Sequence, residues 1–340
     1  MIKETIEKIV NKIDLKEPEM RDAFGEIMSG RATPAQIGAF VTGLRMKGET
    51  VEEITGAAKV MREKCLKIDA GAGLIDTCGT GGSPVSTFNI STAAAFVIAG
   101  AGLKVAKHGN RAASSRCGSA DVLEALGVKI DAPVETVAKC IGRAGVGFMY
   151  APLFHSAMKH AIGPRREIGV RTIFNILGPL SNPARAEYQL LGVYDARLVE
   201  TMANALKNLG ARRALVVHGM DGLDEITITG RTRIAELKDG RIRAYYVTPE
   251  KFGIKCSSLA NIKGSSAKEN ARKILSILEG AKGPGRDIVL MNAGAGLYCA
   301  GKAKDFKEGV RLAAESVDSH SARGALQKLI GLTNVIARER

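Results

Sequence analysis

Tryptophan is absent from the 340-residue sequence, and aromatic residues make up only 4% of it. Proteins that bind single-stranded nucleic acid stack bases on aromatic side chains, so this scarcity argues against such a platform. Six cysteines are present, but no two of them stand close together. Their spacing excludes CxxC redox motifs, the usual zinc-binding patterns and a disulfide framework.

Long hydrophobic runs are also missing. The most apolar stretch, 93–102, is too short to span a bilayer, and the N-terminus has no signal-peptide hydrophobic region. We therefore expect a soluble, cytoplasmic protein that does not bind membranes. With 45% hydrophobic and 25% charged residues, the chain can bury a substantial core, which excludes a disordered protein.

Positive charge is in excess, but it is unevenly distributed. The formal net charge is +14, yet residues 1–70 are neutral with 12 basic and 12 acidic side chains. No run of five or six like charges occurs. Such a basic region indicates solubility alone, binding of phosphate-bearing small molecules, or a nucleic-acid groove, in that order of preference.

The first seventy residues have the signature of a helical domain. Apolar side chains recur at helical spacing, Thr33 and Pro34 are typical of a helix start, and Thr50 with Glu53 fits a capping box. The remainder, 71–340, has short apolar runs that alternate with helical segments. This alternation is typical of a parallel sheet covered by helices.

The sequence thus predicts an α/β fold with a small all-helical domain and a larger α/β domain, whose mostly parallel central sheet is flanked by helices. Strands are predicted at 74–78, 103–106, 146–150, 188–193, 213–217 and 286–291, with three consecutive antiparallel strands within 225–247. Helices are predicted at 91–100, 119–126, 134–143, 196–209, 266–279, 305–317 and 319–334.

A glycine-rich stretch follows the first predicted strand, with three glycines between Gly79 and Gly82. Glycines let backbone N–H groups approach a ligand closely. Asn89, Ser91 and Thr92 then open an alanine-rich helix, whose N-terminus favours an anion. A tight turn with an ordinary helix cap is the alternative, but the density of hydroxyl groups favours phosphate binding. The stretch matches neither a Walker A loop nor GxGxxG.

A second polar segment leaves the next predicted strand. Lys107 and Arg111 can neutralise phosphate charge, and Ser119 can cap the helix that begins there. His108 invites the role of a general base. A single histidine in such a loop is, however, more often a packed or hydrogen-bonding residue.

A third segment contains a basic cluster of Arg165, Arg166 and Arg171. Arginines in this arrangement suit a carboxylate or phosphate. Solvated helix charges are the alternative, above all for Arg166. His155 and His160 stand five residues apart, which is a poor spacing for a shared metal on one helix face.

A fourth segment places Asp221, Asp224 and Glu225 in a glycine-containing loop after a buried-looking strand. Carboxylates at a strand end suit Mg²⁺, which prefers one or two of them together with water and substrate phosphates. An Asp/Gly turn would be the simpler explanation of this loop alone. The phosphate-type segments at neighbouring strand ends favour the metal, because α/β folds bind ligands at that edge.

Taken together, these segments resemble the anthranilate phosphoribosyltransferases. The matching motifs occur in order and at the family's spacing across essentially the whole chain: CGTGG…TFNIST, KHGNR…GSADVLEALG, RTIFNILGPLSNP and VVHGMDGLDEI. The resemblance implies transfer of phosphoribose from 5-phosphoribosyl pyrophosphate (PRPP) to anthranilate, with release of pyrophosphate, in tryptophan biosynthesis. It also implies Mg²⁺, the fold shared with nucleoside phosphorylases, and a homodimer formed through 1–70 together with part of 165–185.

The resemblance assigns roles to individual residues. Positions that hold PRPP in the family correspond to Gly79, Gly82, Thr87, Asn89, Ser91, Thr92, Lys107 and Ser119. We extend this set to neighbouring motif residues, namely Ser83, Ile90, His108, Gly109, Asn110, Arg111, Ser114 and Ser115. The anthranilate positions are Gly79, Asn110 and Arg165, and the metal positions are Ser91, Asp224 and Glu225.

One departure from the family stands in the glycine-rich loop. Ser83 occupies the position after GTGG where the family usually has Asp. An acidic contact is therefore lost, and metal occupancy or PRPP affinity is expected to differ.

No covalent nucleophile is expected, and no catalytic residue is assigned. The amine of anthranilate is neutral at pH 7, so the difficult step is the departure of pyrophosphate from C1 of the ribose. Two alternatives are kept: a pyrimidine-nucleoside phosphorylase and a non-enzymatic nucleic-acid-binding relative. The Asp224–Glu225 pair and Arg165 argue against the first, and the nearly complete substrate motifs argue against the second. We therefore expect PRPP and anthranilate as ligands, and no nucleic acid.

Overall fold

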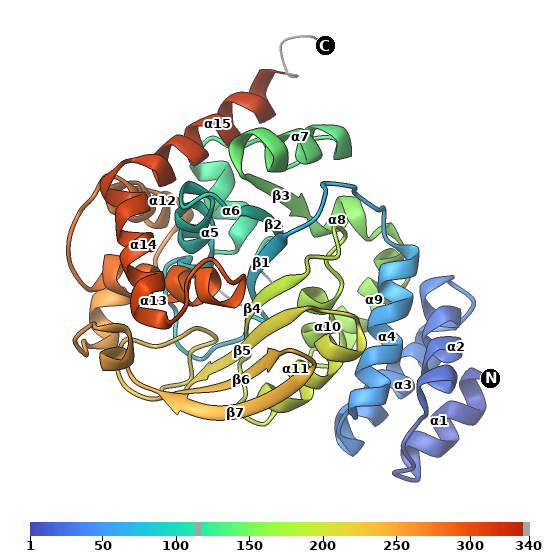
Figure 1. The fold of residues 1–340 in the computed structure, drawn as a ribbon. Helices are drawn as coiled ribbons and strands as arrows, with labels where there is room; N and C mark the ends of the chain where they lie inside the picture. Colours follow the sequence, from blue (N-terminus) through green and yellow to red (C-terminus); the bar gives the residue numbers. More distant parts are fainter. Residues whose placement is uncertain (113–116, 336–340) are drawn as a thin grey trace.

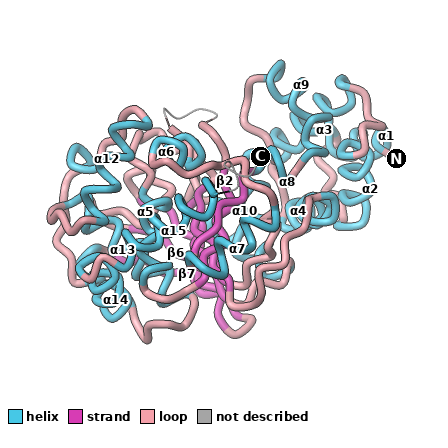
Figure 2. The backbone as a smooth tube through the Cα atoms, turned by 90° about the horizontal axis from the view of Figure 1, so that it is seen from above, coloured by secondary structure: helices cyan, strands magenta, loops and turns pink. Residues whose placement is uncertain are grey.

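The structure, a computed structural model, describes residues 1–112 and 117–335. Figure 1 shows a bundle of helices beside a larger region built on a twisted sheet. The view from above in Figure 2 separates the two regions again, with α1, α2 and α3 on the far side from α13 and α14. No helix in the described ranges has both the length and the apolar character needed to cross a membrane.

The helical region begins with four helices whose ends the sequence marks. Thr33 accepts a hydrogen bond from the Gln36 backbone at 3.3 Å, and Thr50 does the same for Glu53. These capping boxes satisfy backbone N–H groups that a helix start leaves unpaired. The helices are α1 (Ile2–Val10), α2 (Glu17–Met28), α3 (Pro34–Lys47) and α4 (Val51–Lys64). Two later helices pack on them, α9 (Lys159–Ile168) on α2 and α3, and α10 (Phe174–Leu180) on α4.

The described residues form a seven-stranded sheet with the order β3-β2-β1-β4-β5-β6-β7. The first five strands in that order pair in parallel, and β6 and β7 are antiparallel additions at one edge. The strands are β1 (Leu74–Gly79), β2 (Lys104–Gly109), β3 (Val146–Tyr150), β4 (Tyr188–Gly192), β5 (Arg213–Gly219), β6 (Thr232–Lys238) and β7 (Arg241–Val247). This architecture confirms the predicted fold class.

Both faces of the parallel part of the sheet are covered, and the side chains of each strand alternate between the two faces. In β5, Leu215 and Val217 enter one core, whereas Ala214 and Val216 enter the core shared with the helical region. The first core is covered by α5 (Ile90–Gly100), α13 (Pro284–Cys299), α14 (Phe306–Asp318) and α15 (Ser321–Val335), and the second by α11 (Leu198–Asn208).

Four further helices lie between these elements along the chain. They are α6 (Ser119–Ala125), α7 (Val134–Ala144), α8 (Ala151–Phe154) and α12 (Ala267–Leu278), with 3₁₀ turns at Ser156–Met158, Pro249–Phe252 and Leu259–Ile262. Strand order reverses between β1 and β4, the neighbours that share the centre of the sheet. The loops after these parallel strands therefore meet at one edge, where α/β sheets bind ligands.

Two strand predictions are wrong. Residues 286–291 lie inside the buried helix α13, because a short run that is apolar all round fits a buried helix as well as a strand. Gly294 in this helix packs so closely on Gly309 of α14 that a Cβ on either would collide with the other helix. The segment 226–230 is not a strand either, and only β6 and β7 form within 225–247.

Candidate functional site

A cavity of about 560 Å³ lies at the edge of the sheet where the parallel strands end. Residues from all four motifs line it, although they come from distant parts of the chain. They are Gly79, Gly82, Ser83, Thr87, Asn89, Ile90, Ser91, Thr92, Lys107, His108, Gly109, Asn110, Arg111, Ser119, Arg165, Asp224 and Glu225. Ser114 and Ser115, also predicted to bind PRPP, lie outside the described residues.

The glycine-rich loop rests directly on the carboxylate loop. A Cβ at Gly79 would collide with the Asp224 carboxylate, so only glycine fits at the end of β1. The backbone N–H of Gly81 donates to Asp224 Oδ2 at 3.0 Å. Gly81 and Gly82 have φ of 67° and 80°, the left-handed region that favours glycine. The two motifs are thereby joined into one wall of the cavity.

Ser83 adds further hydrogen bonds to this loop. Its hydroxyl donates to the Gly222 carbonyl at 2.8 Å and accepts from the Val85 N–H at 3.2 Å. Arg171 holds the same loop from the opposite side, since its guanidinium donates to the Gly82 carbonyl at 2.6 Å. Ser83 and Arg171 thus add to the hydrogen bond by which Asp224 holds the loop.

The N-terminus of α5 supplies the polar floor of the cavity. Ser91 donates its backbone N–H to Glu225 Oε1 at 3.1 Å. The Thr92 hydroxyl is buried and has no hydrogen-bond partner in the structure. Buried polar atoms are nearly always satisfied, so an orphaned hydroxyl at a helix N-terminus is consistent with a ligand that completes it.

Lys107 is buried beneath the cavity, with 3% of its surface exposed. Its ammonium donates to the Thr77 carbonyl at 2.5 Å and lies 3.4 Å from the Ser91 hydroxyl. Burial lowers the pKa of Lys107, and the charges of Asp76 and Glu225 partly oppose this shift. The structure therefore places a cation next to the predicted phosphate-binding turn.

The fully buried Asp76 and Asn182 support this lysine from below. Asn182 donates to Asp76 Oδ2 at 2.7 Å, and burial raises the pKa of Asp76 to about 6 despite that bond and the charge of Lys107. Asn182 also donates to the Ala106 carbonyl at 2.9 Å, which ties the third motif to β2.

Asp224 and Glu225 form a pair of carboxylates with few partners. Burial raises the pKa of both, and the charge of Asp224 helps to raise that of Glu225 to about 8. A bound cation would relieve this repulsion. Mg²⁺ is commonly held by one or two carboxylates together with substrate phosphates, so Ser91, Asp224 and Glu225 fit it. Among the described residues, no group of three or more His, Cys, Asp or Glu forms a complete metal cage.

Asp221, the third carboxylate of this loop, forms hydrogen bonds within the loop. Asp221 Oδ2 accepts hydrogen bonds from the Thr227 and Thr229 hydroxyls, each at 2.5 Å. His218 is likewise engaged with the chain, through Nδ1 and the Val193 carbonyl at 2.7 Å. Asp221 therefore shapes the turn, and the two following carboxylates face the cavity.

Arg165 and Arg111 differ in how their charges are used. Arg165 is half-buried over the Phe174 ring, 5.0 Å from its centroid, and none of the described carboxylates forms an ion pair with it. Arg111 instead forms ion pairs with Asp121 and Glu124 at 3.0 and 2.9 Å. Arg165 keeps its charge available to an anionic ligand, whereas the charge of Arg111 is largely balanced within the chain.

The helix after the KHGNR motif is capped differently from the prediction. Its N-cap is Gly118, and Asp121 accepts from the Gly118 N–H at 2.8 Å. The Ser119 hydroxyl donates to the Asn110 carbonyl at 3.3 Å, so Ser119 does not cap the helix. The Asp121 carboxylate therefore closes the start of the helix, and it also accepts from the Ala112 N–H at 3.0 Å.

His108 and His155 form a buried pair with ring centroids 5.0 Å apart. Within the described ranges the Nε2 atom of each lacks a hydrogen-bond partner, and His108 Nδ1 contacts the Gly178 carbonyl at 3.1 Å. Burial lowers the pKa of His108 to about 3 and that of His155 to about 4. Such weak bases stay neutral, which argues against His108 as a general base.

The sequence reasoning missed several residues that line the cavity. They are Phe174, Asn175, Gly178, Pro179, Tyr194, Ser265 and Asn270, and Arg171 had been assigned only to the basic cluster. Asn175 to Pro179 belong to the third motif and could have been included. Ser265 and Asn270 carry no local signal, since they reach the cavity only through the tertiary fold.

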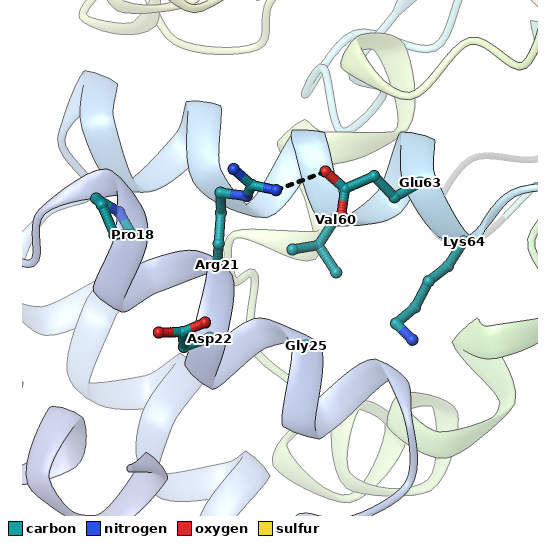
Figure 3. A pocket seen from close by; sticks show the side chains of 7 residues that line it. All are labelled: Pro18, Arg21, Asp22, Gly25, Val60, Glu63 and Lys64. Atoms are coloured by element: carbon teal, nitrogen blue, oxygen red, sulfur yellow. Dashed lines mark hydrogen bonds and ion pairs between the residues drawn. The ribbon is translucent and has the colours of Figure 1, made fainter.

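A smaller hollow of about 330 Å³ lies between α2 and α4. Figure 3 shows Arg21 and Glu63 facing each other across it, joined by an ion pair of 2.8 Å. None of the four motifs reaches this hollow. The larger cavity is therefore the candidate active site.

Comparison with known proteins identifies the family of this chain. A model described as "Glycosyl transferase family, a/b domain" matches residues 71–323, and "Glycosyl transferase family, helical bundle domain" matches residues 3–65. Anthranilate phosphoribosyltransferase from Geobacter sulfurreducens is 56% identical over 349 aligned positions, which cover 98% of this chain and 100% of the relative. This chain belongs to the anthranilate phosphoribosyltransferases.

Solved structures of the family have the same fold. The enzyme from Thermus thermophilus is 43% identical and superposes with a TM-score of 0.92 over 97% of this chain and 99% of its own. The enzyme from Saccharomyces cerevisiae in complex with PRPP and Mg is 29% identical, with a TM-score of 0.90 over 98% of both chains. The resemblance stated from the motifs is confirmed. The chain is a phosphoribosyltransferase of tryptophan biosynthesis.

Proposed function

We propose that this chain transfers phosphoribose from PRPP to the amine of anthranilate in the cavity at the sheet edge, with Mg²⁺ as cofactor. The observation that carries the proposal is the direct contact between the phosphate-type turn and the carboxylate pair. Ser91 N–H donates to Glu225, and Gly81 N–H donates to Asp224. One ligand with phosphate and pyrophosphate groups can therefore meet both motifs at once.

The glycine-rich loop and the start of α5 would hold the phosphate groups of PRPP. Their backbone N–H groups and hydroxyls offer donors, and the helix N-terminus adds a favourable dipole. Lys107 brings a positive charge under the same turn. The other predicted PRPP residues within the described ranges line the cavity as well.

Ser91, Asp224 and Glu225 would hold Mg²⁺. When bound, the ion neutralises developing charge on the departing pyrophosphate. The chain's own residues do the rest: Lys107 and the backbone donors stabilise negative charge in a site from which much water is excluded. Asn182 joins Asp76 of β1 to Ala106 of β2 through buried hydrogen bonds, next to Lys107 on β2.

Arg165, Asn110 and Gly79 would receive anthranilate. Arg165 offers a charged fork to the carboxylate, and its place over Phe174 limits its movement. The amine needs no strong base because it is neutral at pH 7, and the buried neutral histidines beside the site agree with this. Catalysis would come chiefly from holding the amine in line with C1 of the ribose.

A homodimer formed through the helical region is part of the proposal. Four large apolar side chains on or next to α3 and the two helices that pack on it, α1 and α9, are exposed: Val10, Ile13, Met46 and Ile162. Met46 is 81% exposed. Exposed apolar groups that gather on one set of helices favour a protein interface. Met46→Glu should shift the protein toward monomer in sedimentation velocity, and an unchanged profile would argue against this interface.

The test of the activity is anthranilate fluorescence in the presence of PRPP and Mg²⁺. Loss of the signal should require both, and omission of either should stop it. Thymidine with inorganic phosphate tests the alternative phosphorylase activity, and we expect no free thymine. Turnover of thymidine without anthranilate consumption would overturn the proposal. A DNA titration at several salt concentrations tests the nucleic-acid-binding alternative, whose signature is a steep salt dependence.

A further inference from the structure

Asn270 is a buried polar residue in the wall of the cavity. It lies on α12 with 2% of its surface exposed. Its side-chain nitrogen donates to Asn89 Oδ1 at 3.1 Å, and its side-chain oxygen accepts from the Ser265 N–H at 2.8 Å. Because the backbone N–H can only donate, it fixes which end of the Asn270 amide points toward Asn89.

Asn270 and Cys117 together set the orientation of Asn89. Asn89 Oδ1 accepts from the Asn270 nitrogen at 3.1 Å and from the Cys117 thiol at 3.4 Å, and the Asn89 nitrogen donates to the Cys117 carbonyl at 3.1 Å. An amide rotated by half a turn would place a donor against the Asn270 donor and an acceptor against the Cys117 carbonyl. Among the described residues, only Cys117 accepts from the Asn89 nitrogen, which leaves its second hydrogen for a ligand at the position immediately before α5.

The chain around Asn270 also forms the outer support of the phosphate-type turn. Phe88 N–H donates to the Ile262 carbonyl at 3.3 Å, and Gly264 N–H donates to the Ser86 carbonyl at 3.0 Å. A Cβ at Gly264 would collide with the Thr87 carbonyl. The segment that precedes α12 is thus fitted tightly against the turn that leads into α5.

We propose that Asn270 is a positioning residue for PRPP, which acts by holding the Asn89 amide in the orientation that presents its free donor to the ligand. This inference rests on the proposed function, since it assigns a supporting residue to the same site. The Asn270 side chain is nearly fully buried, and its hydrogen bond joins two segments that are 181 positions apart in the sequence. The motif residue Asn89 depends on a partner that no motif contains.

The first experiment compares Asn270→Ala with Ser316→Ala. Ser316 is also buried and donates to the Val97 carbonyl at 2.8 Å, so it anchors the other end of α5. Asn270→Ala should raise KM for PRPP about 10-fold, as expected for one lost buried hydrogen bond, with KM for anthranilate changed less than about twofold. Ser316→Ala should lower Tm but leave both KM values unchanged. An unchanged KM for PRPP in folded Asn270→Ala would overturn the inference.

The second experiment tests whether Asn270 acts through Asn89. In an Asn89→Ala background, removing Asn270 should change KM for PRPP by less than about twofold, because the residue it orients is gone. The full 10-fold effect in that background would show a purely structural role and reject the inference. If Asn270→Ala does not fold, Asn270→Asp keeps the shape and the Ser265 bond but replaces the donor toward Asn89, and the same KM shift is expected.

Assays of the wild-type enzyme distinguish failure of the proposed function from failure of the role of Asn270. Absence of PRPP-dependent anthranilate consumption in the wild type would refute the proposed function itself. Normal wild-type turnover, together with unaltered PRPP binding by Asn270→Ala and Asn270→Asp in calorimetry, would refute only the role of Asn270.

Discussion

Two glutamates, one in the helical region and one in the cavity, differ in how many hydrogen bonds their carboxylates accept. Glu53 is fully buried and accepts from the Leu15 N–H at 2.9 Å, the Thr50 N–H at 2.8 Å and the Lys47 ammonium at 3.0 Å. Glu225 receives one hydrogen bond within the described residues, from the Ser91 N–H. The neighbouring charge of Asp224 adds to its burial and raises its pKa.

The difference teaches how to tell a structural carboxylate from a functional one. A buried charge is tolerated when hydrogen bonds and an opposite charge replace its lost hydration. The chain itself supplies these to Glu53. Glu225 has one such hydrogen bond and the nearby charge of Lys107, which only partly offset its burial and the charge of Asp224. Under the proposed function, a bound cation would supply the rest.

The largest expected effect is the loss of activity in Glu225→Gln. The neutral amide cannot hold Mg²⁺ well, so kcat/KM for PRPP should fall at least about 100-fold at limiting Mg²⁺. Stability without Mg²⁺ should stay the same or rise, because the raised pKa makes Glu225 ionise more easily in the unfolded chain and the neutral amide removes that cost. Asp221→Asn is the matched control: it should lose stability through its threonine contacts yet keep the Mg²⁺ dependence. Near-normal Glu225→Gln rates at limiting Mg²⁺ would break the comparison.

Glu53→Gln should show the reverse pattern. Removal of this charge leaves the buried Lys47 ammonium with the exposed carboxylate of Asp14 as its one remaining ion-pair partner among the described residues. The loss should cost about 3 kcal/mol in the free energy of unfolding. Chemical denaturation measures this loss, and both KM values should stay unchanged. Glu52→Gln, on the exposed side of the same helix, should cost less than about 0.5 kcal/mol. Equal losses in the two variants would contradict the assignment.

Arg165→Ala tests a charge that none of the described carboxylates pairs with. Loss of a charge-assisted contact to the anthranilate carboxylate should cost about 1.5–3 kcal/mol, seen as a rise in KM for anthranilate. Arg166→Ala removes an adjacent exposed guanidinium and should leave that KM unchanged. If Arg165→Ala also leaves it unchanged, Arg165 does not orient the substrate.

The histidine pair should make the protein acid-sensitive by a smaller amount. Burial lowers the pKa values of His108 and His155 below the unfolded value, so the unfolded chain takes up protons first as pH falls. Stability is full above about pH 6.5 and is lost below it, by about 1 kcal/mol per histidine at pH 5.5. The unfolding free energy of His155→Gln should therefore decline less between pH 7 and 5.5. Parallel pH curves for the two proteins would disprove this cause.

Much of the fold could be predicted because its signals are local. The capping residues Thr33 and Thr50 start their helices as expected, and the strands of the parallel sheet follow their apolar runs. The error at 286–291 arose because burial on all sides removes the periodicity that separates a helix from a strand. The close approach of Gly294 to Gly309 explains the glycine there, and only the packed helices reveal it.

The sequence by itself determined where backbone donors, carboxylates and cations stand at the strand ends, because glycine freedom and strand alternation are properties of neighbouring residues. Only the tertiary structure decided which of them remain free for a ligand. In the folded chain Arg111 pairs with Glu124, and Asp221 accepts hydrogen bonds within its own turn. Asn270 reaches Asn89 although 181 positions separate them in the sequence. Hydrogen bonds and ion pairs act over a few ångströms in space, and sequence separation does not measure that distance.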